Sequence, residues 1–122
     1  MSPAVRALRG ATTLDLDDAD HLRERVHALL DELFARNDLT NDDVISILIT
    51  ATPDIHSEYP ATVARSWGLP DVPLIGAQEM DKPGGLPRCV RLLAHVHSER
   101  SKAEMRHVYL EGAKVLRHDL AD

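Results

Sequence analysis

Four polar side chains lie at or near the ends of predicted strands, which is where open sheets tend to bind ligands. Arg9 ends the first predicted strand, and Glu79 follows the third. Arg91 lies one to two turns into the predicted helix that comes next, and Tyr109 stands in a late strand. Arginine binds planar carboxylates through two parallel hydrogen bonds, so this set is typical of a site for a small anion.

Each of these side chains also has an ordinary structural explanation. The two arginines could be solvated surface charges, Glu79 a turn or cap residue, and Tyr109 a half-buried strand aromatic. On strand parity Tyr109 shares a face with His107 and Glu111, while Val108 and Leu110 occupy the other face. From composition and spacing alone, the prediction is a small anion-binding α/β domain.

Several other chemistries lack their sequence patterns. The chain has no Gly-rich dinucleotide fingerprint and no phosphate loop ending in Gly-Lys-Ser or Gly-Lys-Thr. No two of its seven histidines have the i,i+4 spacing of a helical metal site. His95 and His97 would point to different sides of a predicted helix, so we expect neither a metal nor a cofactor.

Covalent catalysis is equally unsupported by the sequence. Cys89 is followed by the apolar Val90, and we interpret it as a small buried side chain rather than a nucleophile, because reactive thiols need an accessible, electropositive setting. Ser57 and Ser66 lack the context of a nucleophile elbow.

Composition limits the partners and the location. A formal charge of -6 argues against binding to nucleic acid, and only four aromatic residues are available for stacking on bases. No stretch approaches the length of a membrane span. A single cysteine and an N-terminus without an apolar run predict a reducing, cytoplasmic location. With 122 residues, the chain is expected to be one domain spanning residues 1–122.

The first half of the chain contains the clearest secondary-structure patterns. Residues 5–9 read as a short strand that ends before Gly10. Apolar residues between Leu22 and Phe34 recur with helical spacing after a run of acids that suits a helix N-terminus. After a turn or short helical cap at residues 40–43, residues 44–50 are nearly continuous in apolar and β-branched side chains, which predicts a strand covered on both faces.

The second half alternates between shorter elements. Pro60 and Gly68 bracket a short helix, and residues 72–77 read as a strand. Apolar residues at 86, 90, 93 and 94 predict a third helix, and closing strands are expected at residues 108–110 and 113–116. The predicted class is α/β or α+β, with a single mixed sheet and helices packed on it.

Six segments together resemble the monofunctional trimeric chorismate mutases in order and spacing. The resemblance runs from about Arg6 to Leu120. It is carried by Arg9-Gly10-Ala11-Thr12-Thr13, Ala51-Thr52-Pro53-Asp54-Ile55-His56, Tyr59-Pro60-Ala61, Gln78-Glu79-Met80-Asp81 with Gly84-Gly85-Leu86, Cys89-Val90-Arg91, and Arg106-His107-Val108-Tyr109-Leu110-Glu111.

This resemblance implies a homotrimer whose three sheets form a pseudo-α/β-barrel, with an active site in each cleft between subunits and chorismate as the substrate. Carried over by position, the substrate-binding residues would be Arg9, Ile75, Gly76, Ala77, Gln78, Glu79, Arg91 and Tyr109. Others would approach from the subunit boundary or from the C-terminal side, namely Tyr59, Ala61, Thr62, Arg65, Leu116 and Arg117. Thr62 stands where relatives often carry Lys, and Gly76 where they often carry Cys, so we expect altered affinity more than lost activity.

The implied reaction is the pericyclic rearrangement of chorismate to prephenate, which needs no proton transfer and no covalent adduct. The catalytic residues would be Arg91 at the ether oxygen, Glu79 at the ring hydroxyl, and Arg9 and Tyr109 at the carboxylates. Two alternatives stay open: an imine or enamine deaminase on a similar trimeric scaffold, and a non-catalytic sensor that binds a dicarboxylate.

Overall fold

The computed structural model describes residues 3–119, the last three of these as backbone alone. In this part of the chain, five strands form one mixed sheet with the order β3-β2-β4-β1-β5. The sheet pairs β1 with β4 and β4 with β2 in antiparallel fashion, whereas β3 and β5 join its edges in parallel. The strands are β1 (Ala4–Thr13), β2 (Val44–Ala51), β3 (Leu74–Gln78), β4 (Cys89–Ser98) and β5 (Val108–Tyr109).

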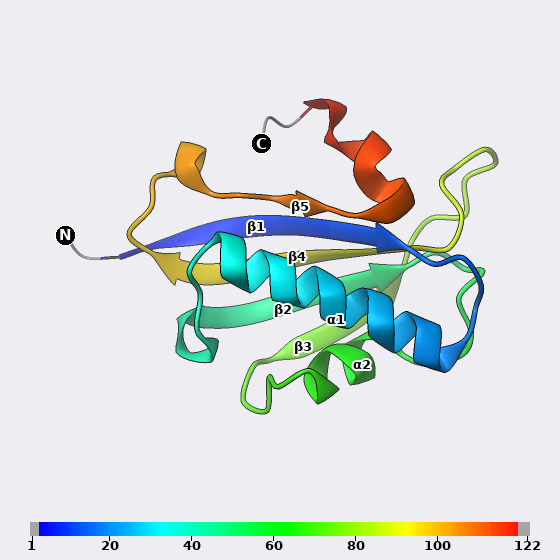
Figure 1. Cartoon of the computed structure of the whole chain (residues 1–122), viewed down its shortest axis with the longest axis horizontal. Helices are drawn as coiled ribbons and strands as arrows, with labels where there is room; N and C mark the ends of the chain where they lie inside the picture. Colours follow the sequence, from blue (N-terminus) through cyan, green and yellow to red (C-terminus); the bar gives the residue numbers. More distant parts are fainter. Residues whose placement is uncertain (1–2, 120–122) are drawn as a thin grey trace.

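The helix α1 (Ala19–Arg36) covers one face of this sheet (Figure 1). Its first turn is capped by Asp18, whose carboxylate accepts the backbone N–H of His21 at 3.0 Å. The apolar spacing noted in the sequence places one stripe of the helix against the sheet, and its six large apolar side chains are all buried. The sequence prediction for this helix is therefore confirmed.

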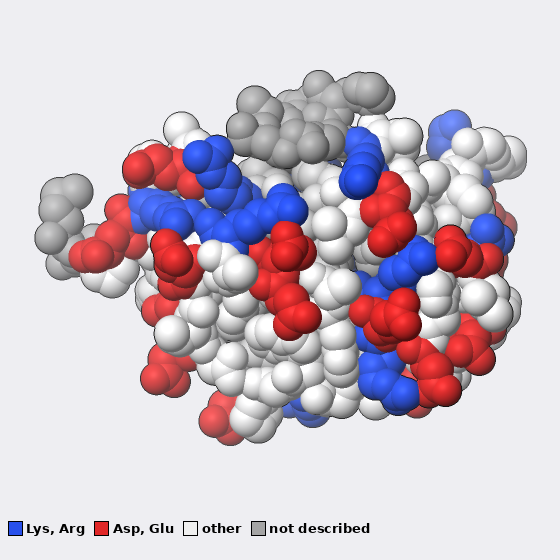
Figure 2. Space-filling view, viewed as in Figure 1, with Lys and Arg blue, Asp and Glu red and all other residues white. Residues whose placement is uncertain are grey.

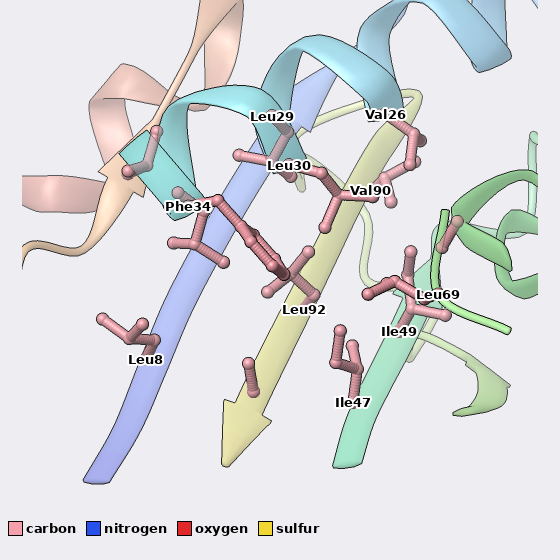
Figure 3. Packing of buried hydrophobic residues seen from close by; sticks show 14 of the residues in the cluster. Leu8, Val26, Leu29, Leu30, Phe34, Ile47, Ile49, Leu69, Val90 and Leu92 are labelled. Carbon is pink, nitrogen blue, oxygen red and sulfur yellow. The ribbon is translucent and has the colours of Figure 1, made fainter. Parts of the chain in front are cut away.

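The main core lies between α1 and the sheet (Figure 3). Leu29, Leu30 and Phe34 of α1 pack over Leu8, Val90 and Leu92 of the central strands. The short helix α2 (Pro60–Ser66) extends this layer over β3 and starts at Pro60, as predicted. Among the described residues, no helix has the length and apolar character needed to cross a membrane.

The opposite face of the sheet carries no α-helix in the described residues and is called the open face here (Figure 1); the 3-10 helix η3 (Glu111–Asp119) covers it only near Ala11 and Tyr109. Strand alternation and pairing assign its side chains. They are Val5, Ala7, Arg9, Ala11 and Thr13 of β1, Ser46, Leu48 and Thr50 of β2, Ile75 and Ala77 of β3, Cys89, Arg91, Leu93, His95 and His97 of β4, and Tyr109 of β5.

The two faces differ in character. On the face that carries α1, acidic and basic side chains intermingle, as on an ordinary solvated surface (Figure 2). On the open face, Val5, Leu48 and Ile75 are large apolar side chains exposed to solvent. The sequence predicted that residues 44–50 would be covered on both faces, but within one chain only the helix side of β2 is covered.

The predicted third helix is wrong. Residues 89–98 form β4, in which the buried Val90, Leu92, Ala94 and Val96 alternate with side chains of the open face. Arg91 therefore extends from a strand, and His95 and His97 share a face instead of pointing to different sides of a helix.

Three further elements differ from the prediction. The first strand continues through Gly10 to Thr13, so Arg9 lies in its middle and not at its end. The predicted closing strand at residues 113–116 is wrong as well, because this segment belongs to the 3-10 helix η3 (Glu111–Asp119). The strand predicted for residues 72–77 begins two residues later, at Leu74.

Candidate functional site

Arg91 and Glu79 form an ion pair at one end of the open face. Arg91 Nε lies 3.3 Å from Glu79 Oε2, and the Thr50 hydroxyl donates a hydrogen bond to the same oxygen. The backbone N–H of Glu79 donates to the carbonyl of Ala51 at 2.9 Å, which continues the β3–β2 ladder by one residue. Hydrogen bonds to both the backbone and the side chain of Glu79 thus fix the position of its carboxylate.

The ion pair is partly accessible rather than buried. Arg91 keeps 45% of its side-chain surface exposed and Glu79 keeps 25%. Both line a cavity of about 740 Å³, together with Leu116 and the connection over residues 79–87. A guanidinium held by one carboxylate and open to a cavity can bind an incoming anion.

A row of small and polar side chains crosses the sheet at the level of Arg91. Arg91 pairs with Thr50 on one side and with Ala11 on the other, and Ala11 pairs with Tyr109. Tyr109 is buried and packs with Ala11, Ala113, Leu86 and Leu116, apart from the main core. The predicted placement of Tyr109 and Val108 on opposite faces is confirmed.

Arg9 lies on the same face, one alternation along β1 from Ala11. It lines a second cavity, of about 430 Å³, with Lys102, His95 and His107. Its backbone N–H donates to His107 Nδ1 at 3.0 Å. Burial, with a further contribution from the charge of Arg9, lowers the pKa of His107, so this imidazole is held in its neutral form with Nδ1 as an acceptor.

A third cavity, of about 630 Å³, lies beside β3 and the N-terminal end of α2. Predicted site residues on its wall are Tyr59, Ala61, Gly76, Ala77 and Gln78. Tyr59 is 77% exposed. Thr52 borders both this cavity and the Arg91 cavity, so the predicted site is divided within one chain into neighbouring parts.

The structure does not bring every predicted residue to these cavities. The guanidinium of Arg65 donates to the carbonyls of Leu69, Pro70 and Val72 at 3.3, 3.1 and 3.4 Å. Ile75 is 67% exposed and borders a small separate cavity on the open face, and Thr62 is exposed. Leu116 lines the Arg91 cavity, whereas the side chain of Arg117 lies outside the described residues.

Cys89 is buried beside Arg91, and this confirms its interpretation as a small buried side chain. Burial raises the pKa of its thiol to about 11, despite the opposing charge of Arg91. A thiol with this pKa is protonated at neutral pH and is a poor nucleophile. Among the side chains that the structure describes, no group of three or more from His, Cys, Asp or Glu could hold a metal ion.

Sequence reasoning assigned no role to three polar residues at this site. Thr50 fixes Glu79, while Thr52 and Asp54 bind the start of β4. Thr52 and Asp54 belong to one of the six segments that carry the family resemblance, but a Thr-Pro-Asp sequence after a strand by itself indicates only a turn. Their partners are 34 to 37 residues away in the sequence, so local spacing could not reveal them.

The fold and the site together define a small α+β protein that presents a cation–carboxylate pair to an open cavity. Its described site residues suit binding and electrostatic stabilisation of an anion more than covalent chemistry. The family model described as chorismate mutase type I matches residues 5–120, and the chain therefore belongs to the chorismate mutase type I family.

Relatives agree with this assignment over nearly the whole chain. The chain is 38% identical over 118 residues to chorismate mutase AroH of Bacillus subtilis, covering 96% of this chain and 93% of the relative. It is 36% identical over 117 residues to chorismate mutase AroH of Thermus thermophilus, covering 95% and 96%. A solved chorismate mutase from Clostridium thermocellum superposes with a TM-score of 0.87 at 41% identity, over 89% of this chain and 97% of that one.

Proposed function

We propose that this chain rearranges chorismate to prephenate in aromatic amino-acid biosynthesis, using placed charges and no covalent intermediate. The observation that carries the proposal is the Arg91–Glu79 pair, held at 3.3 Å and open to a cavity. Chorismate has two carboxylates, and its enolpyruvyl arm must fold over the ring before reaction. The site would bind this folded form.

Arg91 supplies the main electrostatic contribution in this proposal. The ether C–O bond breaks ahead of C–C formation, so negative charge develops on the ether oxygen and positive charge on the ring. A fixed guanidinium beside that oxygen stabilises the transition state more than the ground state. Glu79 accepts a hydrogen bond from the ring hydroxyl and faces the electron-poor ring.

Arg9 and Tyr109 bind the carboxylates and hold the compact conformer. Both lie on the open face with Arg91, on neighbouring strands. Holding the reacting carbons close adds an orientation contribution to catalysis. Gly76 and Ala77 would form part of the wall, and Gly76, with no side chain to offer, removes one contact that relatives often make there.

The active unit is proposed to be a homotrimer with one site in each subunit cleft and with the three sheets facing inward as a pseudo-barrel. Two observations support this. Val5, Leu48 and Ile75 leave an apolar surface on the open face that a second copy would cover. Tyr59 and Ala61 lie in a different cavity from Arg91, so a neighbouring copy would bring these parts together. We also propose that the protein is cytoplasmic and consists of a single domain.

The test is to follow the ultraviolet absorbance of chorismate with purified protein and no added cofactor. We expect saturable loss of chorismate and formation of prephenate. A deaminase would leave chorismate unchanged and release ammonia from imines. A dicarboxylate sensor would gain thermal stability from prephenate without turning chorismate over, and either result would contradict the proposal.

A further inference from the structure

The segment directly after β2 binds the start of β4 through side chains. The backbone N–H of Arg88 donates to both carboxylate oxygens of Asp54, at 3.1 and 2.9 Å. The Thr52 hydroxyl donates to Asp54 Oδ1 and accepts the backbone N–H of Cys89 at 2.9 Å. Two consecutive backbone donors of one chain segment are therefore held by two side chains of another, an arrangement called the Thr52–Asp54 clamp here.

Arg88 needs such support because its backbone is strained. Its φ is 45°, in the left-handed region that non-glycine residues avoid. Besides the clamp, Arg88 exchanges contacts with Leu14: its carbonyl accepts the N–H of Leu14 at 2.8 Å, and its Nε donates to the carbonyl of Leu14 at 3.0 Å. This residue turns the chain from the connection over residues 82–87 into β4.

The clamp lies close to the catalytic pair. Cys89 is the residue at which β4 starts, and Arg91 follows one alternation later on the same face. The backbone N–H of Thr52 also donates to the carbonyl of Cys89 at 3.0 Å, and Ala51 holds the backbone of Glu79. Residues 51–54 thus fix the backbone on both sides of the Arg91–Glu79 contact.

The charge of Asp54 serves this arrangement rather than the substrate. Burial would raise the pKa of Asp54, but hydrogen bonds from Thr52 and Arg88 outweigh it and hold the pKa below its ordinary value. Asp54 is exposed and lines the Arg91 cavity. A carboxylate repels an anionic ligand, and its oxygens here are engaged by the backbone of Arg88.

We propose that Asp54 is a positioning residue for Arg91: with Thr52 it fixes Arg88 and Cys89, and so sets where the Arg91 guanidinium enters the cavity. The inference rests on the proposed chorismate mutase function. It deepens that function by adding a residue that acts through the β4 backbone without touching the substrate.

The test compares Asp54→Asn, Thr52→Val and Thr52→Ser with the parent and with Asp42→Asn, an exposed acid on the 3-10 helix η1 (Asn41–Asp43). An Asn side chain places an NH2 group where one oxygen accepts hydrogen bonds. Small displacements of catalytic groups are costly, so we expect Asp54→Asn and Thr52→Val to lower kcat about 10-fold or more, with KM changed less than about threefold. Thr52→Ser keeps the hydroxyl, so its kcat should stay near that of the parent. The kcat of Asp42→Asn should also match the parent.

Amide hydrogen exchange supplies a readout independent of turnover. The amides of Arg88 and Cys89 should exchange faster in Asp54→Asn than in the parent, with the α1 amides unchanged. An active parent whose kcat is unaffected by Asp54→Asn, or whose KM alone rises, overturns the inference and leaves the proposed function standing. An equal loss of kcat in Thr52→Val and Thr52→Ser also overturns the inference, because the hydroxyl would then not be what matters. A parent that does not turn chorismate over overturns both.

Discussion

Arg91 combines a fixed carboxylate partner with an exposed guanidinium, and these two properties set the expected effect of removing it. Arg91→Ala should lower kcat by at least about 10²-fold, because one preorganised electrostatic donor is commonly worth that much in rate. The KM should change less, since other groups bind the carboxylates. Steady-state kinetics would check this, with Arg23→Ala on the exposed side of α1 as the control. Near-normal turnover of Arg91→Ala would refute the role.

The lowered pKa of His107 predicts how the free energy of unfolding depends on pH. Its pKa is lowered in the folded chain, so the unfolded chain binds the proton more tightly. The free energy of unfolding should therefore be unaffected above the unfolded pKa of about 6.5 and fall as pH drops below it. Arg9, His95 and Lys102 line the same cavity, and the charge of Arg9 contributes to the lowered pKa of His107.

Denaturant unfolding between pH 7.5 and 5 would measure this effect in the parent and in His107→Gln. The variant should lose part of the pH dependence, because Gln can still accept the Arg9 N–H but does not titrate. Equal slopes in the two proteins would show that His107 does not carry the effect.

At the scale of the elements, sequence reasoning succeeded where the local pattern had one interpretation. The helical spacing from Leu22 to Phe34 and the capping acids define α1 without reference to its neighbours. It failed for β4, because the apolar residues 86, 90, 93 and 94 mimic a helix. The alternation of Val90, Leu92, Ala94 and Val96 was also present, and tertiary pairing with β1 and β2 decided between the two.

The candidate site was predictable to a similar extent. Glu79 follows β3 as expected, and the resemblance selected Arg91 and Tyr109 even though Arg91 was placed on the wrong element. Thr50, Thr52 and Asp54 were given no role, because their roles depend on partners brought near by the pairing of β2 with β3 and with β4. Tertiary hydrogen bonds of this kind leave no local signature.

The close contact between Gly112 and Thr13 at the start of η3 predicts that a larger residue at position 112 lowers stability. Gly112 donates its N–H to Thr13 Oγ1 at 2.9 Å, and a Cβ added to Gly112 would also lie 2.9 Å from that oxygen. Thr13 is buried and β-branched, so it cannot easily move away. Gly112→Ala should therefore lower the free energy of unfolding by about 1–3 kcal/mol, the usual cost of overpacking.

The double variant Thr13→Ala with Gly112→Ala removes the obstructing hydroxyl. Its loss of stability should be smaller than the sum of the two single losses, as for residues in direct contact. Strict additivity in thermal or denaturant unfolding would show that the close approach does not exist in solution.

At the scale of the whole molecule, the main feature is that one chain leaves much of its open face uncovered. Its apolar side chains Val5, Leu48 and Ile75 are exposed together with the Arg91–Glu79 pair. Sequence patterns within a chain carry no direct record of a second copy, so the proposed trimer rests on the family resemblance and on this exposed surface. If copies complete each other's sites, defects in different parts of the site should complement one another.

Complementation between two defective variants tests the shared site most directly. Arg91→Ala removes the cation, and Tyr59→Glu places a negative charge on an exposed residue of the other cavity, where it should repel a dianion. Each variant alone should be nearly inactive. The two would be coexpressed with different affinity tags and purified through both, so that only mixed oligomers remain.

In a closed ring of three, either mixed composition contains one interface with both parts intact, so turnover per protomer should recover to about one third of the parent value. Mixed dimers would instead recover about one half. Activity no higher than that of the separate variants would contradict a site shared between copies and would place the whole reaction within one chain.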